Sequence, residues 1–230
     1  MDSPVTMTRA QVLARIDHTL LAPNATQLQL EDACLLGHHL KTASVCIPSF
    51  FTGPCARMLA DSPVKTCTVI GFPHGNHPLR AKLHEAEQAL VEGAQEIDMV
   101  VNISDVKSGH WRHVRKEILQ LTQMTHDAGQ KIKVIFENCY LSQLEKIKLC
   151  QVCNEANVDW VKTSTGFGSS GATPDDVVLM REHSRSKIKA AGGIRDLNSF
   201  FQYCQLGADR IGLSRTAAIL LEYDARFPSE

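Results

Sequence analysis

Two lysines lie in segments that otherwise have the composition of buried strands, and an amine in such a place can act as a nucleophile. Lys162 lies within "DWVKTS" (159–164) and Lys189 within "KIKAAG" (187–192). A buried ammonium group is costly unless it is paired or neutral. If the two segments are neighbouring strands, each ammonium group disfavours the charge of the other, so that one amine is partly neutral at about pH 7. A neutral amine can attack a carbonyl group and form a Schiff base. The alternative is a lysine that extends its ammonium group to solvent.

Asp98 supplies a carboxylate in the middle of another such segment, "EIDMVVN" (96–102). Strand alternation puts Asp98 on the same face as Glu96, where an unpaired carboxylate would be costly. Two lysines that face the same cavity would be its partners. The arrangement is either a structural ion pair or a proton shuttle for the carbinolamine and enamine steps of a Schiff-base reaction. Asp17, in "RIDHT" (15–19), either joins this network or is a structural partner in the first strand.

Glycines follow three successive candidate strands, and their backbone N–H groups are candidates for binding a phosphate. Residues 166–171 spell G-x-G-x-x-G, but this motif follows the sixth strand and no acidic residue ends the next one, so we exclude a nicotinamide dinucleotide. Late strands of (β/α)8 barrels often build phosphate sites from backbone N–H groups. The alternative is that the glycines only form tight turns. The residues predicted to bind phosphate are Gly166, Gly192, Gly193, Gly212 and Ser214.

The elements that must position these groups alternate regularly along the chain. Eight short runs rich in β-branched residues are each followed by a longer amphipathic stretch, and several runs are apolar on both faces, as in parallel strands covered by helices. This pattern predicts a single (β/α)8 TIM barrel with a short N-terminal helix, as one domain over residues 1–230, with its chemistry at the carboxyl ends of the strands. An open doubly wound sheet is the alternative. The predicted strands are 15–19, 43–48, 65–72, 96–102, 131–137, 159–164, 187–192 and 209–214.

Capping signals mark where several of the intervening helices begin. Thr26 with Gln29, and Ser142 with Glu145, have the spacing of a capping box. Thr173 is followed by a proline and two aspartates, which is typical of a first helical turn. Helices are therefore expected directly after Thr26, Ser142 and Thr173.

The bulk properties of the chain exclude several kinds of partner. The net charge is −1, so no overall field favours nucleic acid. No apolar run approaches the roughly 20 residues that span a bilayer, and the first residues lack the apolar core of a signal peptide. Eight cysteines without such a signal predict reduced thiols and a cytoplasmic protein. We therefore expect small-molecule partners, with no nucleic acid and no membrane.

A metal site and a reactive thiol are weaker candidates. His74 and His77 follow a strand and would hold a metal only together with Glu137, and their spacing fits no established metal motif. We therefore expect neither a metal nor another cofactor. Cys46 ends the second strand and faces the predicted site, although most such cysteines are small core residues.

Eight segments resemble the 2-deoxyribose-5-phosphate aldolase family, in the family's order and over nearly the whole chain. The resemblance implies a class I, cofactor-free aldolase on a (β/α)8 barrel. It also implies the reversible cleavage of 2-deoxy-D-ribose 5-phosphate into acetaldehyde and D-glyceraldehyde 3-phosphate, a step in deoxyribonucleotide breakdown. The segments are "IDHTLL", "TVIGFPHG", "EIDMVVNI", "KVIFE", "DWVKTSTGF", "GATPDDVVLM", "IKAAGGIRD" and "ADRIGLS".

The resemblance implies a role for each candidate residue. Lys162 matches the Schiff-base lysine, Asp98 the residue that transfers protons, and Lys189 the lysine that perturbs the Schiff-base lysine. Asp17 matches an aspartate near the substrate hydroxyl groups, and the glycines named above match the phosphate-binding segments together with Ser214. The further predicted substrate-binding residues are Thr19, Cys46 and Thr165.

Two features depart from the family's pattern. Phe167 stands where some members carry a lysine beside the phosphate, and Arg195 and Arg215 are the candidate substitutes for that charge. Tyr223, in the tail, is a candidate to reach the site as a tail tyrosine does in some relatives.

Two other functions stay open at this point. The first is a different phosphosugar-binding TIM barrel, either an isomerase or a metal-dependent aldolase, and the second is a non-catalytic relic that binds phosphate. The combination of Lys162, Lys189 and Asp98 speaks against the relic, because none of them is needed merely to bind phosphate. A homodimer is a further possible partner, since helix faces outside a barrel look alike whether they are solvated or paired.

Overall fold

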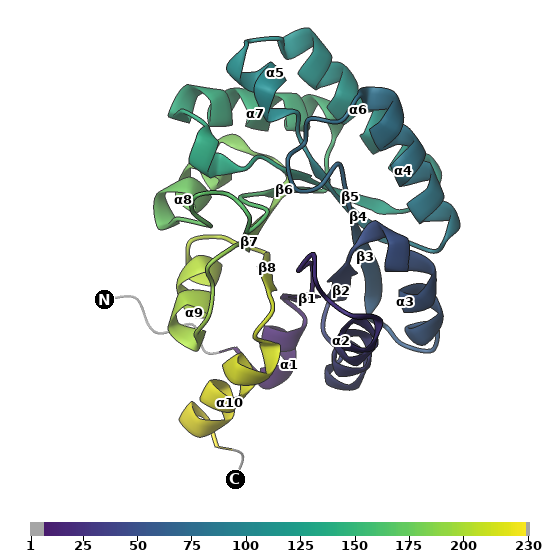
Figure 1. The fold of residues 1–230 in the computed structure, drawn as a ribbon. Helices are drawn as coiled ribbons and strands as arrows, with labels where there is room; N and C mark the ends of the chain where they lie inside the picture. The colour runs from purple at the N-terminus through teal and green to yellow at the C-terminus, as the bar shows by residue number, and fades with distance from the viewer. Residues whose placement is uncertain (1–6, 229–230) are drawn as a thin grey trace.

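The computed structural model describes residues 7–228 and forms a closed barrel of eight parallel strands with helices around its outside (Figure 1). Each strand pairs with the next one in the sequence, and β8 pairs with β1. The predicted (β/α)8 TIM barrel is confirmed, whereas the single domain over residues 1–230 stays a prediction. The strands are β1 (Ile16–Thr19), β2 (Ser44–Ile47), β3 (Lys65–Ile70), β4 (Glu96–Val100), β5 (Lys131–Ile135), β6 (Trp160–Lys162), β7 (Lys187–Ala191) and β8 (Arg210–Leu213).

The predicted N-terminal helix is present as α1 (Arg9–Leu13), and a capping box between Thr8 and Gln11 starts it. The helices expected after Thr26, Ser142 and Thr173 begin there, each with the predicted side chain accepting a backbone N–H. No helix within residues 7–228 is long and apolar enough to cross a membrane. The remaining helices are α2 (Gln27–Leu40), η1 (Ser49–Phe51), α3 (Thr52–Met58), α4 (Leu79–Val91), α5 (Ile103–Lys107), α6 (Trp111–Asp127), η2 (Asn138–Tyr140), α7 (Gln143–Ala156), α8 (Pro174–His183), α9 (Leu197–Gln205) and α10 (Thr216–Arg226).

The main apolar core lies between the sheet and the helices. Along β4, Ile97 and Met99 are fully buried in one hydrophobic cluster with Ile118 and Leu121 of α6. Successive side chains of a strand point to opposite faces, so Asp98, between these two residues, points into the barrel. The predicted alternation along this strand is therefore confirmed, and the inside of the barrel receives charged side chains.

The register of the sheet brings these charged side chains to one level. Lys162 of β6 pairs with Lys189 of β7, which confirms the similar height predicted for the two lysines. Asp98 of β4 pairs with Lys133 of β5. In parallel strands such partners lie about 5 Å apart and point to the same face. The sheet alone thus gathers three amines and a carboxylate inside the barrel.

Candidate active site

Three lysines meet at Asp98 inside the barrel. Lys162 Nζ and Lys189 Nζ donate hydrogen bonds to Asp98 Oδ2 at 2.8 and 2.7 Å. Lys133 Nζ donates to Asp98 Oδ1 at 2.9 Å. All four side chains are buried. The structure therefore brings together the three predicted catalytic residues and adds Lys133, which the sequence analysis missed.

A second carboxylate, Asp17, lies on the other side of Lys189. Lys189 Nζ is 2.5 Å from Asp17 Oδ2, and Arg210 Nη1 donates to Asp17 Oδ1 at 2.5 Å. Ser44 Oγ donates to the same oxygen at 2.6 Å. Asp17 is fully buried, so its direct contacts are with Lys189 and Arg210 and not with the open pocket described below. Of the two arrangements that the sequence left open for Asp17, the structure has the one in which it joins the lysine network, and its predicted contact with substrate stays untested.

Glu96, the first residue of β4, is the third carboxylate of the network. Lys133 Nζ donates to Glu96 Oε2 at 2.5 Å, and Arg210 Nη1 donates to the same oxygen at 3.2 Å. Arg210 was not singled out from the sequence. It is the first residue of its strand, a position at which a charged side chain usually extends into solvent. One signal for Lys133 was available: "KIK" occurs at 131–133 and again at 187–189, where its last lysine is Lys189.

The network keeps Asp98 and Lys189 ionised. Burial alone would raise the pKa of Asp98, but the ammonium groups of Lys133, Lys162 and Lys189 outweigh it and hold this pKa well below its ordinary value. Burial would lower the pKa of Lys189, but Asp17 and Asp98 outweigh it and raise this pKa above its ordinary value. The repulsion predicted between the two lysines therefore does not neutralise Lys189, because the carboxylates outweigh it, and which amine is neutral stays a prediction.

A pocket of about 360 Å³ opens above this network, at the carboxyl ends of β1, β6, β7 and β8. Lys162 is the one lysine that lines it, whereas Asp98, Lys189 and Asp17 lie beneath its floor. The apolar part of the pocket lining consists of Leu20, Leu21, Ala22, Ala191, Ile194 and Leu213. The other predicted residues that line the pocket are Thr19, Thr165, Gly166, Gly192, Gly193, Gly212 and Ser214.

The glycines in this pocket do more than form turns. Gly192 has φ +85°, and a Cβ atom there would lie 2.9 Å from the Cα atom of Gly171, so the loops after β6 and β7 are in backbone contact. Gly193 has φ +79°, and a Cβ atom there would meet nothing within 4 Å. Gly212 has another role, because a Cβ atom there would lie 3.0 Å from Cε of Lys189. The loop after β7 thus exposes its backbone at Gly193, and Gly212, within β8, leaves room for the lysine.

Cys46 does not line this pocket. It is fully buried inside the barrel and pairs in register with Cys67 of β3. Cys67 Sγ lies 3.3 Å from Asp98 Oδ1 and accepts a contact from Lys133 Nζ at 3.4 Å. Cys46 therefore packs under the charged network as a small core residue, and its predicted contact with substrate stays untested.

The residues considered for a metal do not come together. His74 and His77 are exposed, and Glu137 is buried at the carboxyl end of β5 with φ 56°. Glu137 accepts a hydrogen bond from the backbone N–H of Thr165 at 3.1 Å and another from the Thr165 hydroxyl. The carboxylate therefore shapes the loop that follows Lys162, a structural role that the sequence analysis did not find.

The residues that depart from the family's pattern separate into two groups. Phe167, Arg195 and Arg215 line the pocket, and the ring of Phe167 packs edge-to-face on Phe72 with centroids 5.3 Å apart. Tyr223 instead lies on α10, where its hydroxyl donates to the backbone carbonyl of Met7 at 2.8 Å. Tyr223 thus ties the last helix to the N-terminal segment and does not reach the pocket.

Comparison with known proteins gives relatives over most of the chain. Deoxyribose-phosphate aldolase of Rhodopirellula baltica is 53% identical over 209 residues, which are 90% of this chain and 87% of the relative. The enzyme of the same name from Caldanaerobacter subterraneus is 46% identical over 211 residues, or 90% of this chain and 91% of the relative.

Solved structures and a family model give the same result as these relatives. A solved structure described as QR15, an aldolase, superimposes with a TM-score of 0.88 at 36% identity and covers 94% of this chain and 96% of its own. A tetrameric deoxyribose phosphate aldolase from Aeropyrum pernix gives 0.88 at 29% identity, over 95% and 93%. The sequence model of the DeoC/LacD family aldolases matches residues 11–214. The chain therefore belongs to the DeoC/LacD family of aldolases.

Proposed function

We propose that this protein is a class I deoxyribose-phosphate aldolase that cleaves 2-deoxy-D-ribose 5-phosphate reversibly through a Schiff base on Lys162. The observation that carries the proposal is the position of this lysine. It is the one amine of the buried network that lines the pocket, and the glycine loops suited to a phosphate line the same pocket. The relatives that share this family carry the name of the same enzyme.

A charge count supports Lys162 as the amine that attacks the substrate. Inside the barrel four basic side chains share three carboxylates, so one basic group has no counter-charge of its own. Lys162 contacts a single carboxylate, whereas every other basic member contacts at least two. Release of the Lys162 proton on reaction leaves three cations for three carboxylates. The basic members are Lys133, Lys162, Lys189 and Arg210, and the carboxylates are Asp17, Glu96 and Asp98.

The reaction begins with attack of the neutral Lys162 amine on the aldehyde carbon of the open-chain sugar. Loss of water from the carbinolamine gives an iminium ion, which accepts electrons. Removal of the proton from the β-hydroxyl group then breaks the adjacent carbon–carbon bond, and its electron pair moves toward the iminium nitrogen to form an enamine. D-Glyceraldehyde 3-phosphate departs at this step. Protonation of the enamine carbon and hydrolysis of the new iminium release acetaldehyde and the free amine.

Asp98 and Lys189 are the groups that move protons in this scheme. Asp98 Oδ2 is 2.8 Å from Lys162 Nζ, within the distance that general acid–base catalysis requires. Lys189 holds the same oxygen at 2.7 Å and so fixes its direction. Because Asp98 lies beneath the pocket floor, a water molecule between it and the substrate carries the proton to and from the hydroxyl group.

The phosphate end of the substrate is assigned to the loops after β7 and β8. The backbone of Gly193 faces open space, and α10 begins at Thr216 with no side chain of the described residues capping its first N–H groups. Free N–H groups at a helix start favour an anion. Arg195 and Arg215 line the same pocket and supply the positive charge that Phe167 does not. Ser214 adds a hydroxyl donor.

Borohydride trapping tests this proposal. The protein is incubated with acetaldehyde and reduced, and the added ethyl group is mapped by peptide mass spectrometry. We expect the label on Lys162, and we expect Lys162→Arg, whose long basic side chain stays charged and cannot form the imine, to lose both the label and turnover. Lys131→Arg, at an exposed strand lysine, is the matched control and keeps both. Turnover retained by Lys162→Arg, or a label on another lysine, would contradict the assignment.

A cytoplasmic location and self-association belong to the same proposal. All eight cysteines are free thiols, which supports a reducing compartment. A solved relative is described as a tetramer, which supports assembly from copies of one chain, for which we keep the homodimer as the expected unit. Light scattering coupled to gel filtration measures the assembly directly, and a monomer at micromolar concentration would contradict it.

A further inference from the structure

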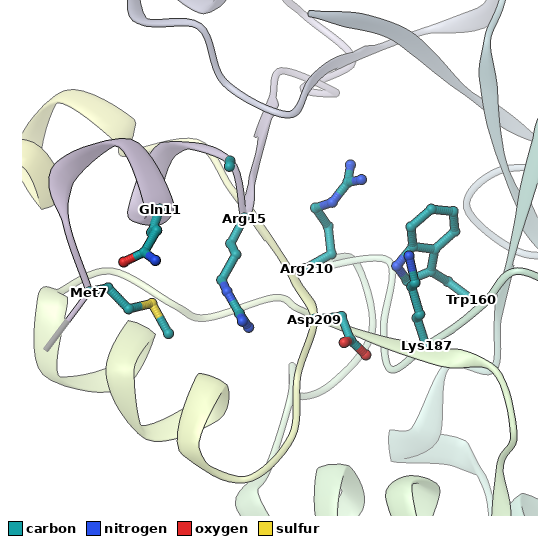
Figure 2. A pocket seen from close by; sticks show the side chains of 8 residues that line it. Met7, Gln11, Arg15, Trp160, Lys187, Asp209 and Arg210 are labelled. Atoms are coloured by element: carbon teal, nitrogen blue, oxygen red, sulfur yellow. The ribbon is translucent and has the colours of Figure 1, made fainter. Parts of the chain in front are cut away.

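A second hollow, of about 520 Å³, lies at the amino-terminal ends of the strands, whereas the lysine pocket lies at their carboxyl ends. Figure 2 shows the side chains that line this second hollow. Trp160, Lys187 and Arg210 are the first residues of β6, β7 and β8, and Arg15 directly precedes β1. Helix α1 closes one side of it. We call this hollow the basal pocket; it is lined chiefly by Gln11, Arg15, Trp160, Lys187, Asp209 and Arg210.

The one acidic residue of the basal pocket is already compensated. Asp209 Oδ2 lies 3.5 Å from Arg181 Nη1, outside the pocket lining, and accepts the backbone N–H of Ile188 at 2.9 Å. This single carboxylate, shared with Arg181, leaves the basic side chains that line the hollow with a net positive charge. A pocket whose basic residues keep their charge attracts anions.

Two of those basic side chains have no carboxylate partner among residues 7–228. Lys187 is exposed, and its ammonium group lies 5.1 Å from the ring centroid of Trp160. Arg15 is half-buried, and its Nη1 donates to the backbone carbonyl of Ala208 at 3.0 Å. A guanidinium group carries five N–H donors, so Arg15, which also contacts the Cys204 thiol, keeps donors for a ligand.

Arg210 and Trp160 separate the basal pocket from the catalytic network. Arg210 is bound to Asp17 and Glu96, and its guanidinium carbon lies 5.1 Å from the Trp160 ring centroid. Lys133 approaches the same ring to 5.6 Å from inside the barrel. The indole ring thus lies between the charged interior and the hollow. The basal pocket is therefore a site of its own and not the lower end of the lysine pocket.

We propose that the basal pocket binds a phosphate group, either free or as a small monoester, between Arg15 and Lys187. The fork of Arg15 matches two phosphate oxygens, and the ammonium group of Lys187 supplies a point charge for a third. Arg210 adds to the local positive field without leaving its carboxylates. The hollow is within the size range of small-ligand sites. This site is independent of the proposed aldolase chemistry.

Tryptophan fluorescence reports on this site directly, because the chain has two tryptophans and Trp160 lines the pocket. In Trp111→Phe, Trp160 is the only tryptophan. We expect inorganic phosphate, added at constant ionic strength, to change its emission saturably. Parallel titration with glycerol 3-phosphate separates free phosphate from a monoester by affinity. A linear drift without saturation would overturn the proposal, because it would reflect screening alone.

Paired variants assign the signal to one pocket. In the Trp111→Phe background, Arg15→Gln and Lys187→Gln should each weaken phosphate binding about tenfold or more, with turnover retained as proof of folding. Arg215→Gln alters the lysine pocket and should leave the Trp160 signal unchanged, and Arg185→Gln is a control for lost surface charge. Loss of the signal in Arg215→Gln, or its survival in both Arg15→Gln and Lys187→Gln, would overturn the proposal.

Discussion

Lys82 and Lys162 are both buried lysines bonded to a carboxylate, but they lie in different surroundings. Lys82 Nζ, on α4, donates to Glu117 Oε1 of α6 at 2.6 Å and to the carbonyl of Val100 at 2.7 Å. This pair lies outside the barrel, between helices and sheet, and burial lowers the pKa of Lys82 and raises the pKa of Glu117. One ion pair in an apolar layer does not overcome the cost of desolvation. The pair links α4 and α6 to the carboxyl end of β4.

Inside the barrel the balance is reversed. Asp98 is bound by Lys133, Lys162 and Lys189 together, and their ammonium groups hold its pKa well below its ordinary value in spite of burial. Several charges within one network keep each other ionised, where a single pair does not. Because the network has one basic group in excess and opens to a pocket at Lys162, that amine is available for chemistry. The Lys82 pair, closed on all sides, has no such group.

The largest expected effect is that of Asp98→Asn, which removes the charge that the cluster shares and keeps the shape of the side chain. We expect kcat/KM for cleavage to fall roughly 10²- to 10⁴-fold, because a general acid–base group is lost and the ammonium groups lose their common partner. Release of D-glyceraldehyde 3-phosphate, measured with a coupled dehydrogenase, gives the rate. Glu117→Gln is the matched control and should change kcat/KM far less. A loss below about tenfold for Asp98→Asn would show that Asp98 is only structural.

Lys82→Met probes the other pair through stability. The substitution leaves the Val100 carbonyl without its partner and leaves Glu117 buried with only the backbone N–H of Asn102, so we expect the free energy of unfolding to fall by about 3–5 kcal/mol. The measurement is urea denaturation followed by circular dichroism.

The double variant Lys82→Met/Glu117→Leu sharpens this test. It removes the unpaired carboxylate and should recover most of the lost stability, because a hydrophobic pair replaces an isolated ion pair at little cost. Equal stability of the single and double variants would mean that the Lys82–Glu117 pair stabilises the fold through packing alone.

The fold and three members of the network could be predicted from the sequence for a physical reason. Charged residues within apolar, β-branched runs stand out, and this applies to Asp98, Lys162 and Lys189. Lys133 does not stand out, because it lies two residues after Lys131, which is exposed, and both occur at the start of the same strand. Which of these lysines enters the barrel depends on closure of the sheet, and that property is not local.

Lys82 and Cys46 show the same limit in other elements. Lys82 lies on a helix with a charged or polar residue at nearly every second position, and its burial follows from packing of α4 on α6 and from Gly71, where a Cβ atom would meet its Cε at 2.7 Å. Cys46 faces the barrel as predicted, but the depth of the pocket floor, which decides whether it touches a ligand, depends on the side chains of all eight strands.

Acidification provides a smaller effect with opposite signs in the two regions. Asp98 has a pKa held below the ordinary 3.8, so its contribution to stability is present above about pH 4 and is lost as the pH falls further. Glu117 has a raised pKa, so its contribution is lost as the pH rises above the ordinary 4.5. Below about pH 4 the wild type should lose stability more steeply with falling pH than Asp98→Asn. Parallel slopes in denaturation at several pH values would contradict the assignment.

The smallest effect is expected from an exposed pair with the same short distance. Arg115 Nε lies 2.7 Å from Glu155 Oε2, and the two side chains are 53% and 54% exposed. Water screens such a pair and already solvates both charges, so Arg115→Ala should lower the free energy of unfolding by less than about 1 kcal/mol. A double-mutant cycle with Glu155→Ala isolates the pairwise part. A coupling energy as large as that between Lys82 and Glu117 would mean that distance, and not burial, sets the energy of these pairs. A coupling energy below about 0.5 kcal/mol would leave burial and the number of shared charges as the two variables that distinguish the Arg115 pair, the Lys82 pair and the network around Asp98.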